Sequence, residues 1–181
     1  MILLFAAIER RRTPRGPHVP TALFVAGYLL VWCVFGVLAV TLQSAASAAA
    51  VVGAEMAVTP AALAGGLLVA AGLYQLTPIK QTCLRHCRDP ARFLAAYWRP
   101  GRAGALRMGL AHGGYCLGCC WFLMLLLFVG GVMDLAWIGG LALFVLMEKL
   151  VSAGHRLSQA AGLALIAVGS WMVTSALSAY A

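Results

Sequence analysis

The chain alternates long apolar stretches with short polar segments. Several of the apolar stretches approach the roughly 20 residues that an α-helix needs to cross a bilayer. This pattern predicts an all-α fold: a polytopic transmembrane helix bundle of about five spans, with residues 1–181 forming a single membrane domain. The expected spans are residues 20–43, 59–79, 109–129, 132–147 and 157–180.

The longest polar segment, residues 80–107, has an amphipathic pattern of its own within residues 91–99. Prolines bracket a run in which apolar side chains recur at helical spacing. We expect a short helix lying along the membrane surface with its aromatic side chains turned inward. The alternative is a solvated loop. The apolar side chains are Phe93, Leu94, Tyr97 and Trp98.

The N-terminal segment, Met1 to Ile8, is apolar but too short to span a bilayer, and Glu9 and three arginines follow it. A signal peptide has the opposite order, with its positive charges before the apolar run. Two interpretations remain. The segment is a short interfacial anchor, or it is the end of a span that begins upstream.

Composition agrees with a membrane protein. Apolar residues make up 63% of the chain and charged residues only 10%, whereas about a quarter of the residues of a soluble domain are charged. The net charge of +8 raises the question of a nucleic-acid partner. Because the basic residues lie in short loops between apolar runs, membrane topology explains them better, and we expect no nucleic acid to bind.

The thirteen Lys and Arg residues fall on one side of a five-span topology. The other side, made of residues 44–56, the Gly130-Gly131 turn and the C-terminus, contains none. The positive-inside rule therefore makes the basic loops cytoplasmic and the C-terminus, with Tyr180, external. The basic residues are Arg10, Arg11, Arg12, Arg15, Lys80, Arg85, Arg88, Arg92, Arg99, Arg102, Arg107, Lys149 and Arg156.

Five of the six cysteines lie near this inner face, in two groups that each include a histidine. At about 100° per residue, the members of the second group fall within an arc of roughly 100° on one helix. Topology brings the first group to the same membrane depth, so the two groups are expected to meet. The groups are Cys83, His86 and Cys87, and then His112, Cys116, Cys119 and Cys120.

Thiolates and imidazoles three to four residues apart are ligands for soft or borderline metals. Copper or zinc is the expected ion, and an iron–sulfur cluster remains open. The spacing matches neither a zinc finger nor a c-type haem attachment, and disulfides are disfavoured in the reducing cytosol. The alternative is that these small residues only ease helix packing.

The remaining polar residues give weaker signals. Cys33, in the middle of the first span, is expected to be a small buried packing residue. Glu148 marks the inner end of the fourth span, or serves as an oxygen ligand or partner of a histidine. His155 is expected to be solvated, and Asp134 to start a helix facing water. No catalytic triad or phosphate-binding loop is present in the sequence, so an enzyme is disfavoured.

Several motifs resemble an uncharacterised bacterial family described as predicted metal-binding integral membrane proteins. The resemblance covers roughly residues 20–170 and implies a bacterial inner membrane protein with a metal site. Members of that family begin with a further methionine-rich hydrophobic region, whose tail Met1 to Ile8 would be. The motifs are GLYQLTPIK (72–80), CLRHCRDP (83–90), WRPG (98–101), RMGLAHG (107–113), YCLGCCW (115–121) and EKL (148–150).

The leading hypothesis is therefore an integral membrane protein with a copper or zinc site at the cytoplasmic boundary, used in metal handling or delivery. The main rival is an accessory subunit that binds no metal and packs against other membrane-protein subunits in the lipid bilayer. A haem-binding redox subunit is disfavoured, because no histidine lies deep in an expected span.

Overall fold

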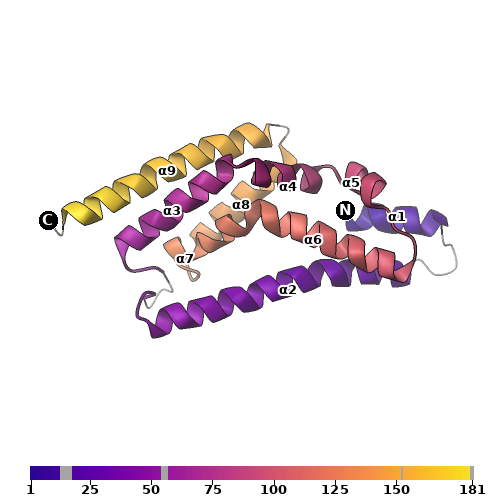
Figure 1. Cartoon of the computed structure of the whole chain (residues 1–181), viewed down its shortest axis with the longest axis horizontal. Coiled ribbons are helices and arrows are strands. Elements are labelled where there is room, and N and C mark those ends of the chain that lie inside the picture. The colour runs from indigo at the N-terminus through magenta and orange to yellow at the C-terminus, as the bar shows by residue number, and fades with distance from the viewer. Residues whose placement is uncertain (13–17, 54–56, 152, 180–181) are drawn as a thin grey trace. The chain divides into compact units, whose positions relative to one another are not determined.

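The computed structural model describes residues 1–12, 18–53, 57–151 and 153–179, and these are almost entirely helical, as predicted (Figure 1). Besides helices, the described ranges contain an isolated antiparallel bridge between Val52 and Val58. Tyr180, whose location was predicted to be external, lies outside the described residues. The helices are α1 (Ile2–Arg12), α2 (His18–Ala48), α3 (Ala61–Leu76), α4 (Pro78–Arg88), α5 (Pro90–Tyr97), α6 (Gly101–Leu125), α7 (Leu127–Gly130), α8 (Leu135–Leu150) and α9 (Gly154–Ser178).

Each expected span coincides with a helix, but the count of five full spans is wrong. Among the described residues, three helical segments are long and apolar enough to cross a membrane: α2, Gly101–Gly130 (α6 with α7), and α9. A fourth is reached if α3 and α4, which are bent by 65° relative to each other, form one broken span. The helix α8 has only 16 residues, about 24 Å at 1.5 Å per residue, which is short for an apolar core of about 30 Å.

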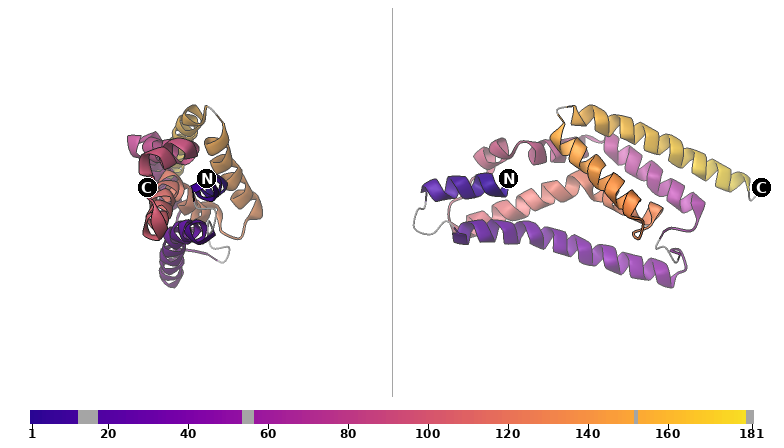
Figure 2. Two further views of the ribbon diagram at one scale, coloured as in Figure 1. Left: turned by 90° about the vertical axis from the view of Figure 1, so that its right-hand side faces the viewer. Right: turned by 180° about the vertical axis from the view of Figure 1, so that it is seen from behind.

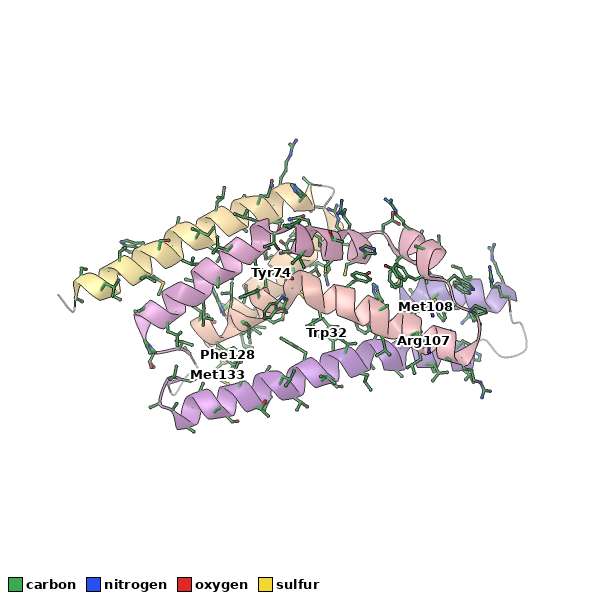
Figure 3. The ribbon with its side chains drawn as sticks, in the orientation of Figure 1. Trp32, Tyr74, Arg107, Met108, Phe128 and Met133 are labelled. Atoms are coloured by element: carbon green, nitrogen blue, oxygen red, sulfur yellow. The ribbon has the colours of Figure 1, made fainter. Side chains whose placement is uncertain are left out.

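The chain divides into two compact units, and the first comprises Met1–Leu38 and Thr82–Cys119. Its core is aromatic: the ring of Phe5 in α1 stacks on that of Phe24 in α2, with centroids 4.7 Å apart. Met108 of α6, labelled in Figure 3, is buried in this core. The N-terminal segment is therefore helical and packed on protein. The buried core residues are Phe5, Phe24, Phe93, Leu94, Ala105 and Met108.

The predicted short helix in residues 91–99 is present as α5. Asp89 caps it, because its side chain accepts a hydrogen bond from the backbone N–H of Arg92 (3.0 Å). Phe93 and Leu94 are buried in the core of this unit, so this part of the expected lipid-facing surface is covered by protein. The next helix, α6, starts at Gly101, eight residues before the expected span.

The second unit comprises Ala39–Gln81 and Cys120–Ala181. Within it, α3 and α9 lie side by side along their lengths (Figures 1 and 2). Their contact depends on paired glycines. A Cβ atom added to Gly65 would lie 2.7 Å from the carbonyl oxygen of Gly169, and one added to Gly72 would lie 2.6 Å from that of Gly162. Small residues thus let the two backbones touch, as is common between membrane helices.

The break between α3 and α4 occurs at Pro78, which has no N–H to give to the carbonyl of Tyr74. The hydroxyl of Thr77 donates to that carbonyl instead (2.8 Å). The next carbonyl, of Gln75, accepts from Gln81 Nε2 at 3.2 Å. The backbone carbonyls that lose their helical hydrogen bonds at the bend thus accept hydrogen bonds from nearby side chains. A chain in lipid requires such partners, because no water is available there.

Candidate metal centre

The two cysteine groups lie on α4 and α6, and within the first unit these helices are in contact. Cys83 and Cys87 are four residues apart on α4 and are only partly buried. Cys116 and Cys119 of α6 are buried, with exposed fractions of 5% and 2%. The thiols therefore form a gradient, from more accessible on α4 to enclosed on α6.

Cys87 is the residue at which the two groups meet. Hydrogen bonding to the Cys116 thiol, then to the Cys119 thiol, together with burial, raises the pKa of Cys87 well above its ordinary value. Such an interaction requires the three sulfur atoms to be neighbours across α4 and α6. This juxtaposition agrees with the expectation that the two sequence groups come together.

Cys83 contacts α6 one turn away from Cys87. A Cβ atom added to Gly118 would lie 2.9 Å from the sulfur of Cys83, so this thiol packs directly against the α6 backbone. Burial, followed by the charge of Cys119, raises the pKa of Cys83. Gly118 thus makes room for Cys83.

The α6 thiols also have partners of their own. The Cys119 thiol donates to the carbonyl oxygen of Cys116 (3.0 Å), one turn back on the helix. The sulfur of Cys116 lies 3.5 Å from the hydroxyl oxygen of Tyr28 in α2, a neighbour that the sequence pattern did not identify. Cys120 is buried on the same helix but belongs to the second compact unit.

The two histidines are held by aromatic contacts. The ring of His86 stacks on that of Tyr115, with centroids 4.2 Å apart and planes 5° apart. Its Nδ1 lies 2.8 Å from the carbonyl oxygen of Thr82; because a carbonyl only accepts, Nδ1 carries the proton and neutral His86 keeps Nε2 as a ligand nitrogen. His112 is buried beside the rings of Phe24, Tyr28 and Phe93.

The neighbouring thiols of α4 and α6 do not form a complete set of metal ligands in this structure. In the part of the chain that is described, no group of three or more His, Cys, Asp or Glu side chains is arranged to hold a metal ion. The donors present are nevertheless soft thiols in a largely enclosed place, which suits Cu(I) better than hard cations. Ligation by the seven residues expected from the sequence stays a prediction.

Three sequence expectations about individual residues need correction. Cys33 is exposed on α2 rather than buried, as are its apolar neighbours Leu30 and Val34. Glu148 is neither an interfacial marker nor a histidine partner: it is buried and forms an ion pair with Lys80. Lys80, counted among the basic loop residues, is itself completely buried. Asp134 caps α8 as expected, accepting from the N–H of Ala136 at 2.8 Å.

Sequence comparison points to copper. A family model described as PpoB2: Copper chaperone matches residues 1–172. The chain belongs to the PpoB2 copper chaperone family. No curated protein and no solved structure matches the chain. Membership of the PpoB2 family supports a role in metal handling and makes copper the favoured ion among those that the donors could bind.

Proposed function

We propose that this protein is a membrane-integrated copper chaperone that holds Cu(I) between α4 and α6. The observation that carries the proposal is the packing of the Cys83 sulfur against Gly118, which lies between Cys116 and Cys119 on α6. The hydrogen bonding of Cys87 to Cys116 and Cys119, which raises the Cys87 pKa, agrees with this contact. Thiolates are the ligands that Cu(I) prefers, and a small set of them allows the ion to pass between sulfurs without being released. Cys83 is the fourth thiol of this set, and His86, His112 and Cys120 are the further candidate ligands.

The difference in exposure between the α4 and α6 thiols gives the transfer of Cu(I) a direction. Cys83 and Cys87 are partly accessible, whereas Cys116 and Cys119 are enclosed. An incoming ion therefore meets the α4 thiols first and moves inward to the α6 thiols as each new bond to sulfur replaces an old one. Delivery to a recipient protein runs the same exchange outward through α4.

Membrane insertion is the second part of the proposal. The helix α2 has a mean hydropathy of 2.5 in its most apolar window, and its outer face exposes Leu30, Val37 and Leu38 by more than half. Such a surface is suited to lipid. With α3–α4 as one broken span and the short α8 also crossing, all the basic segments share one side, which the positive-inside rule makes the cytoplasmic side. A C-terminal reporter that is active only in the cytoplasm would reject this orientation.

The copper site is tested by loading purified protein with Cu(I) under anaerobic conditions and measuring metal per chain and the copper X-ray absorption spectrum. We expect bound copper with sulfur neighbours, lost in Cys87→Ser and in Cys116→Ser. Cys33→Ser is the matched control, because Cys33 is exposed on α2, and it should retain copper. A parent protein that binds zinc but no copper, or neither, would refute the proposal; absence of both would favour the accessory subunit.

A further inference from the structure

A groove of about 480 Å³ lies between α1 and α2, within the first unit. On its α1 side are Ala6 and Arg10, which are one turn apart on the same face of that helix. Its α2 side is a single stripe, because the residues that form it recur every three to four positions along the helix. The stripe includes His18, Ala22, Ala26 and Leu29. The groove thus follows one continuous face along the first part of α2.

The groove is cationic at one end and almost entirely apolar along the rest. The two helices run in opposite directions (Figure 1), so Arg10, near the end of α1, lies at the same end of the groove as His18, the first residue of α2. Both side chains are exposed, and the described residues of the lining include no Asp or Glu. The other end is formed by Leu29, which is 51% exposed. Such a groove suits a molecule with an anionic head and a hydrocarbon body.

The length of the groove matches one leaflet of a bilayer. From His18 to Leu29 the α2 stripe rises about 16 Å at 1.5 Å per residue, and half of the apolar core of a bilayer is about 15 Å thick. The small side chains of Ala6, Ala22 and Ala26 leave room for a narrow chain between the two helices. A lipid tail fits this space when its headgroup lies at the cationic end.

Resting on the proposed membrane insertion, we propose that this groove binds one anionic phospholipid, with its phosphate at Arg10 and His18 and one acyl chain along α2. A guanidinium group forms charge-assisted hydrogen bonds to phosphate. A histidine ring has an N–H to donate whether it is neutral or charged. The headgroup then lies in the leaflet that faces the basic side of the protein, where anionic lipids are attracted most strongly.

A second copy of the chain is a poorer occupant of the groove. The chain carries thirteen basic and five acidic residues, and of the acidic ones Glu9 and Glu148 are buried. A second copy therefore brings few carboxylates to Arg10 and adds repulsion between two positively charged proteins. A free phosphate ion would leave the apolar part of the groove uncovered. An anionic lipid supplies the negative charge and covers the apolar part at the same time.

The test measures lipid binding to the purified protein in neutral detergent by native mass spectrometry. The probes are dioleoyl-phosphatidylglycerol, dioleoyl-phosphatidylcholine and inorganic phosphate. Arg10→Gln removes the charge at the headgroup end, and Arg11→Gln is its matched control, since Arg11 is exposed but does not line the groove. Ala26→Phe fills the apolar part. Its control is Ala7→Phe, which puts the same ring at an exposed position of α1 outside the groove.

We expect the parent to bind one phosphatidylglycerol per chain, about tenfold more tightly than phosphatidylcholine, as charge-assisted hydrogen bonds imply. Inorganic phosphate should not displace the lipid. Arg10→Gln should abolish the preference for phosphatidylglycerol, and Ala26→Phe should weaken binding of both lipids about tenfold. Both control variants should behave as the parent.

Equal binding of the two lipids by the parent, or equal effects of Arg10→Gln and Arg11→Gln, would overturn the inference, because surface charge alone would then attract lipid. So would unchanged binding in Ala26→Phe, since no acyl chain would lie in the groove, and so would displacement of the lipid by inorganic phosphate. None of these outcomes depends on copper. A parent protein that stays in solution without detergent would reject the proposed membrane insertion itself.

Discussion

The ammonium nitrogen of Lys80 lies 2.8 Å from Glu148 Oε1 and 3.0 Å from Oε2, and both side chains are almost completely buried. Gln75 also accepts from the Lys80 ammonium, and the Ser158 hydroxyl donates to the same amide oxygen at 3.0 Å. The start of α4 is thus tied to α8, α3 and α9 by one polar network within the second unit. Buried charged side chains such as these are tolerated in a protein interior only when they are paired.

Breaking this pair should destabilise the protein. Glu148→Gln leaves the Lys80 ammonium buried without its counter-charge, and we expect a loss of about 3–5 kcal/mol, measured by thermal unfolding in detergent. Arg156→Gln removes an exposed charge and should have little effect. A double variant, Lys80→Met/Glu148→Leu, should recover part of the loss; no recovery would show that the charges themselves are needed.

Adjacent glycines in α3 provide a test of helix contact. Gly65→Ala places a methyl group 2.7 Å from the carbonyl oxygen of Gly169, so we expect it to cost about 1–3 kcal/mol. Gly66→Ala meets no atom within 4 Å and should be neutral or slightly stabilising, since alanine is the better helix former. Denaturation of both variants in the same detergent gives the comparison, and equal effects would contradict the α3–α9 contact.

Gly118 should influence copper without being a ligand. In Gly118→Ala the new methyl group would lie 2.9 Å from the Cys83 sulfur and displace it, and we expect copper affinity to fall about tenfold, as for other changes next to metal ligands. Gly114→Ala, on the same helix with no atom within 4 Å of the new Cβ, is the control. Competition with a Cu(I) chelator measures both affinities. Unchanged affinity in Gly118→Ala would argue that Cys83 is not a ligand.

Copper affinity should rise with pH. Hydrogen bonding to Cys116 and Cys119 and burial raise the pKa of Cys87, so the thiol holds its proton at neutral pH and copper must displace it. Each proton released increases the apparent affinity about tenfold per pH unit, up to the raised pKa. The measurement is chelator competition at pH 6, 7 and 8. Cys33→Ser should show the same slope as the parent, because Cys33 is exposed on α2, whereas an affinity independent of pH would mean that no thiol proton is displaced.

Helical periodicity was enough to predict that the α6 cysteines share one side of a helix, since the geometry of 3.6 residues per turn is local. It also indicated that Cys83 and Cys87 form a second pair. Periodicity could not show that the α4 cysteines contact the α6 cysteines. That expectation came from the membrane topology, which put both groups at the same depth. The opening that Gly118 provides for Cys83 is a property of two backbones, so it becomes visible only in three dimensions.

The sequence was misleading where charge alone was used to infer exposure. Lys80 was assigned to a cytoplasmic loop because it follows the second expected span and begins a segment rich in arginine. Its partner, Glu148, is 68 residues away, and no local pattern connects the two. Cys33 was misplaced for the converse reason: a small apolar residue was assumed to face protein, although a helix in lipid has apolar residues on both sides.

The spacing of the glycines in the α3–α9 contact bears on which changes in chain length the protein can accept. Gly65 and Gly72 are seven residues apart, as are their counterparts Gly162 and Gly169. A single inserted residue between either pair would turn one glycine by about 100° away from its partner backbone. The intervening side chains can be exchanged for others of similar size, but the number of residues between the glycines cannot vary. We therefore expect insertions and deletions during divergence to fall in the segments outside these two heptads.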